Sequence, residues 1–196
     1  IQPLEMNGRV VLPQFYLGTN IKNWGKSAIK VYTSAPTLAE LRHGYETNEA
    51  IRQNVHANRP KGEFTATFLR DGKEAIERPE RVYFDEKHGW VAEGGKVHKV
   101  ELPPEGWALE YDKQTGFPSR SSKDRKDAER VFGRDEASFF DYATDGLYAV
   151  RRVFAWHFRG HCPFYVGAGW RPDVWRGYLG SRSVRYEGQP ERKYIL

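Results

Sequence analysis

The feature that most constrains this chain is a series of short alternating segments between residues 63 and 112. In the first segment Phe64, Ala66 and Phe68 share one side of an extended strand, because successive side chains alternate between its faces. Asp71-Gly72 follows, and both residues tolerate the positive φ angles of a tight hairpin turn. The pattern therefore predicts two antiparallel strands joined by a short turn.

More extended segments follow this hairpin, and glycine, proline or charged residues separate each segment from the next. They cover residues 81–85, 90–93, 96–102 and 107–112. Short strands at such regular intervals are typical of antiparallel sheets. We predict an antiparallel β-meander over about residues 63–112.

Farther along the chain the period of the apolar residues becomes that of a helix. They recur at steps of three and four residues, at Phe139, Ala143, Leu147, Val150, Phe154 and Phe158. This spacing predicts one long helix over about residues 136–158, in which Gly146 costs about 1 kcal/mol relative to alanine. The expected fold class is α+β, with the meander packed against the helix and an irregular, aromatic and arginine-rich extension at the C-terminal end.

Shorter helices are expected in front of the meander. Thr37 and Glu40 have the spacing of a capping box, in which each side chain accepts a hydrogen bond from the other residue's backbone N–H. Gly44 is a candidate stop for that helix. A second short helix is predicted over about residues 48–57.

The polar stretch 113–126 is rich in turn-forming residues, and it predicts a long exposed loop. Ser122 can cap a short helix that ends at Gly133. The chain of 196 residues is typical of a single domain. Within it we expect three parts, which cover residues 1–112, 113–133 and 134–196.

The stretch from Leu147 to Tyr186 stands out by its composition. It contains ten aromatic residues and seven arginines but one acid, Asp173, so it carries a charge of +6 while the whole chain carries +5. Arg151, Arg152 and Arg159 lie near the end of the predicted helix, where the helix dipole favours cations. The arginines beyond Gly160 have no such structural reason.

The residues beyond Gly160 are therefore the predicted partner-binding site. Tryptophan, tyrosine and arginine are the residues most enriched at protein interfaces. The same residues also bind RNA or single-stranded nucleic acid, because bases stack on rings and guanidinium groups meet phosphates. The candidate residues are Trp170, Arg171, Trp175, Arg176, Tyr178, Arg182, Arg185 and Tyr186.

The known catalytic motifs give no support for an enzyme. The dinucleotide and Walker patterns, G-x-S-x-G, H-E-x-x-H and paired C-x-x-C are all absent. His157, His161 and Cys162 lie close together in sequence, but a structural zinc site needs four ligands. Cys162 is the only cysteine, so no internal disulfide can form. We expect no cofactor and no metal.

Three functions are compatible with these observations. The first is a non-catalytic accessory or structural subunit of a larger assembly, which binds other protein subunits through its basic, aromatic C-terminal segment. One alternative is a protein that binds RNA or single-stranded nucleic acid. The other is an enzyme with a site built from Asp145, His157, His161 and Cys162.

The expected location follows from two absences in the sequence. A single cysteine and the lack of any apolar run of about 18 residues favour an intracellular protein without a membrane span. The sequence begins at Ile1, and its only methionine is Met6. If a leader was removed before Ile1, an organelle matrix is the alternative location.

Overall fold

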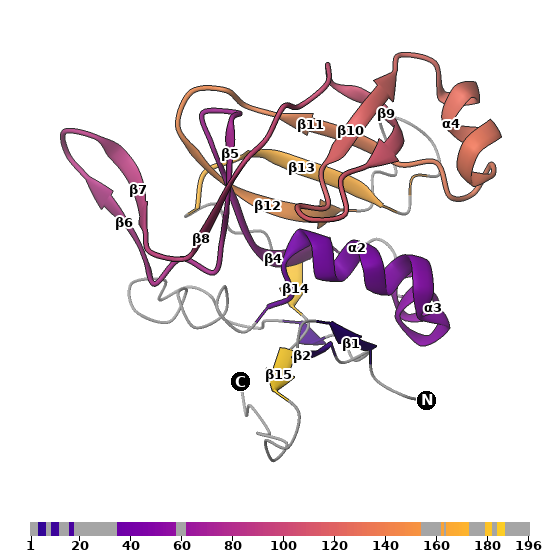
Figure 1. The fold of residues 1–196 in the computed structure, drawn as a ribbon, viewed down its shortest axis with the longest axis horizontal. Coiled ribbons are helices and arrows are strands. Elements are labelled where there is room, and N and C mark those ends of the chain that lie inside the picture. Colours follow the sequence, from indigo (N-terminus) through magenta and orange to yellow (C-terminus); the bar gives the residue numbers. More distant parts are fainter. Residues whose placement is uncertain are drawn as a thin grey trace.

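The protein has an α+β fold, in which short helices pack on a curled mixed β-sheet (Figure 1). The structure is a computed structural model. It describes residues 4–6, 9–11, 16–17, 35–57, 62–153, 162, 164–172, 179–181 and 184–186. Within this described part there are three helices, one large sheet and two small ones.

The large sheet has ten strands. Along its main path the order is β10 (Pro118–Ser122), β9 (Gly106–Tyr111), β11 (Phe139–Tyr142), β13 (Tyr165–Trp170), β12 (Leu147–Val153), β4 (Gly62–Arg70), β14 (Leu179–Ser181) and β3 (Tyr16–Leu17). Two further strands branch from this path, because β5 (Glu74–Glu77) pairs with β4 and β8 (Lys96–Lys99) pairs with β5. The β11–β13 and β4–β14 pairs are parallel and the others are antiparallel, so the sheet is mixed.

Strand β4 is the central element of this sheet. It pairs with β12 over most of its length, with β5 through its last residues and with β14 through its first residues. Both of its faces are covered, since every residue from Gly62 to Leu69 is buried. Phe64 and Phe68 contribute to one hydrophobic cluster and Leu69 to another, as the alternation of side chains requires.

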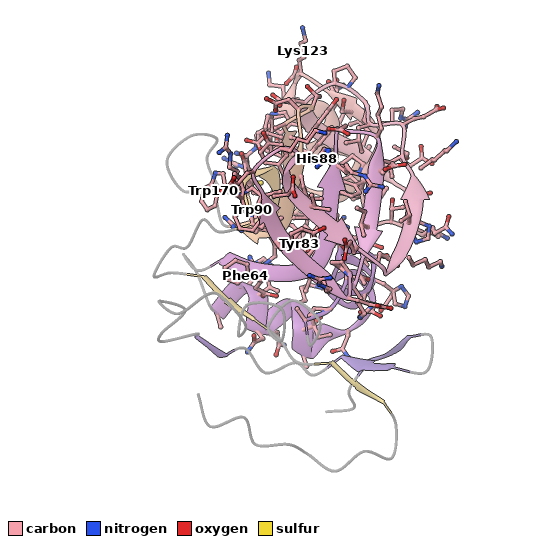
Figure 2. The ribbon with its side chains drawn as sticks, turned by 90° about the vertical axis from the view of Figure 1, so that its left-hand side faces the viewer. Phe64, Tyr83, His88, Trp90, Lys123 and Trp170 are labelled. Carbon is pink, nitrogen blue, oxygen red and sulfur yellow. The ribbon has the colours of Figure 1, made fainter. Side chains whose placement is uncertain are left out.

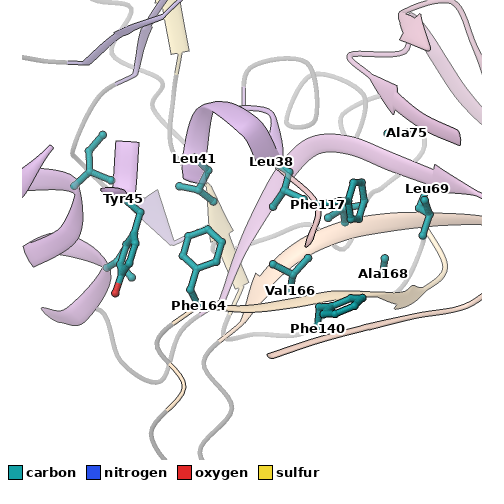
Figure 3. Close-up of a cluster of buried hydrophobic side chains, with 13 residues drawn as sticks. Leu38, Leu41, Tyr45, Leu69, Ala75, Phe117, Phe140, Phe164, Val166 and Ala168 are labelled. Atoms are coloured by element: carbon teal, nitrogen blue, oxygen red, sulfur yellow. The ribbon is translucent and has the colours of Figure 1, made fainter. Parts of the chain in front are cut away.

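One face of the sheet is covered by two helices, α2 (Leu38–Thr47) and α3 (Glu49–Ala57). The capping box of Thr37 and Glu40 starts α2, and the backbone N–H of Leu38 donates to Oγ1 of Thr67 on β4 at 2.9 Å. Figure 3 shows the apolar side chains of α2 above those of the sheet. This main core contains Leu38, Leu41, Tyr45, Ile51, Val55, Leu69, Ala75, Phe117, Phe140, Val150, Phe164, Val166 and Ala168.

The opposite face is covered by a hairpin of β6 (Arg81–Asp85) and β7 (Gly89–Glu93), which lies between β5 and β8 in sequence. These two strands form a sheet of their own. Val82, Trp90 and Ala92 of the hairpin pack against a second cluster. That cluster also contains Phe64, Phe68, Ile76, Leu147 and Ala149, with Trp170 at its border.

The third helix, α4 (Arg125–Phe132), lies along β9 at the far end of the sheet (Figure 1). Asp124 caps its first turn and Gly133 ends it. Ala128 is the buried residue of this helix, and it packs in a third cluster with Trp107, Ala137, Phe139 and Cys162.

A small sheet joins the two ends of the described chain. Its strands are β1 (Leu4–Met6), β2 (Arg9–Val11) and β15 (Val184–Tyr186), with β2 in the middle. All of its pairs are antiparallel. No helix among the described residues has the length and the apolar character needed to cross a membrane.

The long helix predicted over residues 136–158 is wrong. Residues 139–142 form β11, a turn follows, and residues 147–153 form β12. Gly146 has a φ of +127°, which suits this turn and no helix. The apolar residues of this stretch do not share one face, as they would on a helix. Leu147 and Val150 pack in clusters on opposite faces of the sheet. Residues 154–158 lie outside the described residues.

The positions of the strands within residues 63–112 are confirmed, but their arrangement as a meander is wrong. Strands β4, β5 and β8 are neighbours, and the β6–β7 hairpin is set apart from them. Strand β9 pairs instead with β10 and β11 at the other end of the sheet. Contacts with distant parts of the chain decide this order, and the local alternation carries no information about them.

Three other expectations change as well. The predicted loop over 113–126 contains strand β10, although the short helix after it does end at Gly133. The segment beyond Gly160 is not irregular throughout, since it supplies β13, β14 and β15. The helix that starts after Thr37 continues past Gly44 to Thr47, whereas the second short helix is confirmed as α3.

Candidate interaction surface

The structure locates two of the predicted partner-binding side chains, those of Trp170 and Arg171. Trp170 is the last residue of β13 and is half-buried, and Arg171 follows it and is exposed. Arg185 and Tyr186 belong to β15, where their backbones pair with β2. The remaining candidates lie outside the described residues, namely Trp175, Arg176, Tyr178 and Arg182.

Trp170 is partly a core residue of this protein. The guanidinium carbon of Arg151 lies 4.9 Å from the centre of the Trp170 ring and 5.1 Å from that of Phe64. One nitrogen of Arg151 also donates to the carbonyl oxygen of Arg171 at 3.2 Å. Arg151 is 1% exposed, so these cation–π contacts are shielded from water and strong for their kind. They hold the end of β13 and one edge of Trp170 in place.

The β6–β7 hairpin lies beside Trp170, because Trp90 and Trp170 pack against the same cluster (Figure 2). We call residues 81–93 the aromatic arm. Its strands pair so that Val82 is opposite Ala92 and Phe84 is opposite Trp90, which places all four side chains on one face. This face passes from the core at Ala92, which is 8% exposed, to solvent at Phe84, which is 57% exposed.

Phe84 and Trp90 form the outer end of this apolar face. Their ring centroids are 5.6 Å apart and the planes meet at 70°, which is the edge-to-face geometry that aromatic pairs prefer. Phe84 has the largest exposed fraction among the large apolar side chains that the structure describes. The arm therefore presents an ordered aromatic pair to the outside.

The turn at the tip of the arm is held by Asp85. Its Oδ1 accepts hydrogen bonds from the backbone N–H groups of Lys87 and His88 at 2.9 and 2.8 Å, and it lies 2.8 Å from Nδ1 of His88. The bond from the His88 N–H is the main cause that lowers the pKa of Asp85. Gly89 closes the turn with a φ of +73°. A tip with these bonds keeps the strands of the arm in register.

The other face of the arm is polar. The hydroxyl of Tyr83 donates to Glu93 at 2.6 Å, and this bond is the main cause that raises the pKa of Tyr83. Arg81 pairs with Glu93 at 3.2 Å and lies over the ring of Tyr83 at 5.0 Å. The arm carries a small negative charge, because residues 81–93 contain three acids and two basic residues.

A hydrogen-bonded cluster of Tyr45, His56 and Glu136 connects α2 and α3 to the turn before β11. The Tyr45 hydroxyl donates to Glu136, and Nε2 of His56 lies 3.1 Å from that hydroxyl and 3.4 Å from Oε1 of Glu136. Burial, followed by the bond to Glu136, raises the pKa of Tyr45 far above its usual value. Such a phenol keeps its proton at neutral pH, which fits a role in holding α3 in place.

Two buried arginines are engaged in internal pairs nearby. Arg42 pairs with Glu46 at 2.7 Å, and its guanidinium carbon lies 3.7 Å from the centre of the Tyr111 ring. Arg152 pairs with Glu63 at 3.1 Å, and both side chains are 0% exposed. The guanidinium group of Arg42 therefore fills the aromatic site that a cationic ligand would otherwise occupy.

The structure describes two of the four residues of the predicted catalytic site, Asp145 and Cys162, and they lie near opposite ends of β11. Cys162 is buried, and its Sγ accepts a hydrogen bond from the backbone N–H of Phe139 at 3.3 Å. Phe139 is the first residue of β11. Asp145 follows the other end of β11, and its carboxylate accepts a hydrogen bond from the hydroxyl of Tyr148 at 2.8 Å. His157 and His161 lie outside the described residues. Within the described part, no group of three or more histidine, cysteine, aspartate or glutamate side chains could hold a metal ion.

Sequence reasoning missed the aromatic arm as a surface. The strands 81–85 and 90–93 were both expected, and the polar turn between them is confirmed. A usable signal was present on the first strand, because Val82 and Phe84 alternate with Arg81, Tyr83 and Asp85, whereas Trp90, Val91 and Ala92 form a continuous apolar run on the second. The exposure of Phe84 depends on how far the hairpin extends beyond the core, and only the fold decides that.

Comparisons of this chain with protein-family models, with curated proteins and with solved structures found no match. Among the described residues, the arm and the adjoining Trp170 form the aromatic surface with the clearest exposed component.

Proposed function

We propose that the protein is a non-catalytic accessory subunit of a larger assembly, and that it binds a partner protein through the aromatic face of its arm. The observation that carries this proposal is the position of Phe84, which is 57% exposed at the end of a face that begins in the core. Trp170 borders the same cluster. The partner-binding role predicted for the C-terminal residues beyond it is a separate part of this proposal.

The aromatic pair has the properties of an interface anchor. Fully burying a phenylalanine side chain contributes about 1.5–3 kcal/mol, so Phe84 has much to gain from a partner. Aromatic residues dominate the binding energy of protein interfaces. Trp90 and the strand register already restrict the ring of Phe84, so little side-chain entropy remains to be lost on binding.

The charge of the arm indicates the chemistry of the partner. The arm contains Asp85, Glu86 and Glu93 against two basic residues, so its net charge is −1. Charged rims of opposite sign steer association and fix the orientation of two proteins. The partner is expected to present an apolar pocket with lysine or arginine at its rim.

The buried polar groups also fit a structural subunit better than an enzyme. All three side chains have internal partners, since Tyr45 joins α2 to Glu136, Arg42 pairs with Glu46 within α2, and Arg152 of β12 pairs with Glu63 of β4. A catalytic group would instead need to reach a substrate. Their geometry supports a scaffold that carries the arm.

The test is site-specific photo-crosslinking in the native source of the protein. A photoreactive residue at position 84 is expected to capture one defined protein chain. The matched control is position 131, because Val131 is 52% exposed and lies on α4, away from the arm. Phe84→Ser is then expected to abolish co-purification of the captured chain, whereas Val131→Ser should retain it.

Two results would overturn the proposal. The first is a Phe84→Ser variant that co-purifies with the same chain, in the same amount, as the wild type. The second is crosslinking that is equal at positions 84 and 131, because it would show random collisions and no docking surface.

A further inference from the structure

Exposed basic residues lie on α4 and just beyond both of its ends. Lys123, Lys126, Arg130 and Arg134 follow one another at steps of three, four and four residues, and all four are exposed. The buried residue Ala128 marks the opposite side of the helix. Lys126 and Arg130 belong to α4, whereas Lys123 precedes its cap Asp124 and Arg134 follows Gly133. We call the four residues the basic row. Figure 2 shows Lys123 pointing away from the body of the protein.

The acids of the same segment leave most of this charge in place. Residues 113–134 contain seven lysines and arginines against three acids. Asp124 accepts the backbone N–H of Lys126 as the helix cap, and Glu129 pairs with Arg125 at 2.7 Å. Asp127 pairs with Arg130 at 3.2 Å, but the Arg130 side chain remains 77% exposed.

Lys123, Lys126 and Arg134 form no ion pair with any carboxylate that the structure describes. Most described arginines elsewhere do have such a partner. Those that pair with a carboxylate outside this segment are Arg42, Arg52, Arg70, Arg78, Arg81 and Arg152. The basic row therefore brings together four exposed cations, of which Arg130 alone pairs with a carboxylate among the described residues.

The helix dipole favours Arg130 in the last turn of α4, but it does not explain the sign of the charges at Lys123 and Lys126. A surface helix needs polar residues on its solvent side, and glutamate would serve as well as lysine. Near the start of a helix the dipole disfavours cations, yet Lys123 and Lys126 lie there. A negatively charged partner would relieve this conflict.

We propose that the basic row binds the sugar–phosphate backbone of a nucleic acid. Several exposed cations close together in the chain can contact neighbouring phosphates, and guanidinium groups can contact phosphate oxygens with two hydrogen bonds. Contacts of this kind position a strand and carry no sequence information. The partner is therefore a nucleic acid of any sequence.

A membrane surface fits this helix less well. Helices that bind membranes insert an apolar face among the lipids. The apolar side of α4 is used within the protein, where Ala128 packs with Trp107 and Phe139. Beside the row, Val131 is the one large apolar side chain of α4 that is described as exposed.

The basic row and the aromatic arm lie on opposite sides of the molecule (Figure 1). A partner protein on the arm and a nucleic acid on α4 can therefore bind at the same time. The assignment of the basic row does not depend on the function proposed for the arm.

The test measures binding of the purified full chain to fluorescein-labelled oligouridylate and to a labelled DNA duplex at increasing salt. With four phosphate contacts, the logarithm of the affinity for the single strand is expected to fall with a slope of up to about −3 against the logarithm of salt concentration. Replacing Lys123, Lys126, Arg130 and Arg134 by glutamine should weaken binding about tenfold or more at low salt and flatten this slope.

The control variant carries Lys73→Gln and Lys87→Gln. Both lysines are exposed, and they lie in turns of the β4–β5 and β6–β7 hairpins. This variant should bind the oligonucleotides within about twofold of the wild type, because its lost charges are remote from the row. Circular dichroism should show that both variants are folded.

The proposal is overturned if the wild type shows no salt-dependent binding, or if the glutamine variant of the row binds with unchanged affinity and slope. Binding to phosphatidylserine vesicles that needs the row, without binding to either oligonucleotide, would overturn it in favour of a membrane partner. Phe84→Ser should bind oligonucleotides normally, so failure of the arm and failure of the row are distinguishable.

Discussion

Trp90 stands edge-on to Phe84 across the β6–β7 pair, with ring centroids 5.6 Å apart and planes at 70°. Trp90 also packs against the cluster that contains Phe64 and Phe68. One tryptophan thus connects the exposed tip of the arm with the interior of the protein. The contact between the two rings makes the exposed aromatic surface as ordered as the core beneath it.

Phe84 and Phe68 provide a direct comparison of a binding residue and a core residue. Phe84→Ala should lower the free energy of unfolding by less than about 1 kcal/mol, because this ring is already 57% exposed. Phe68→Ala should lower it by about 3–5 kcal/mol, because Phe68 is 0% exposed and leaves a cavity. Urea denaturation of the two variants measures both values. Equal losses would show that Phe84 contributes to stability and weaken its assignment to binding.

Removing one charge of the buried pair of Glu63 and Arg152 should lower the stability of the protein strongly. Glu63→Gln removes the carboxylate that faces the guanidinium at 3.1 Å, and it should cost about 3 kcal/mol or more because both groups are shielded from water. Replacing both residues, with Glu63→Leu and Arg152→Met, should recover a large part of this loss. Thermal unfolding tests both variants. A double variant that is less stable than Glu63→Gln would contradict this explanation.

The turn at the tip of the arm should open in acid. The pKa of Asp85 in the folded protein is lowered, so the folded state favours the carboxylate above the ordinary pKa of 3.8, and this contribution is lost as the pH falls through the lowered value. The backbone amide signals of Lys87 and His88 should shift with a midpoint below pH 3.8 in an NMR titration. Asp85→Asn should remove this transition. A midpoint at or above 3.8 would mean that the hydrogen bonds to Asp85 do not persist in solution.

Gly116 and Gly133 separate the cost of a positive φ from the cost of a collision. Gly116 has a φ of +75°, and a Cβ there would lie 2.7 Å from the backbone nitrogen of Ala39. Gly133 has a φ of +95°, and no atom lies within 4 Å of its Cβ position. Gly133→Ala should therefore cost about 1–3 kcal/mol from strain, because glycine alone readily adopts a φ of +95° with a ψ of 157°. Gly116→Ala should cost more, because α2 must also move. Chemical denaturation gives the difference, and equal costs would show that the contact between α2 and the β9–β10 turn adapts freely.

The sequence alone identified the elements that local chemistry determines. Thr37 and Glu40 start α2 as the capping box predicts, and the alternation around Phe64 marks β4. The row of Lys126 and Arg130 could also be found from its spacing, because a short capped helix was expected there. In these places the deciding contacts lie within a few residues along the chain.

The tertiary structure alone decided where those elements lie and which residues they expose. The residues from Phe139 to Val150 have helical spacing, yet pairing with β4, β9 and β13 makes them strands, and Gly146 forms the turn between them. Trp170 was expected at a partner surface, but the guanidinium of Arg151 holds it at the border of the core. Phe84 is exposed because the hairpin extends past the cluster on which Trp90 rests. Such contacts join residues that are distant in sequence, and a local pattern of residues does not encode them.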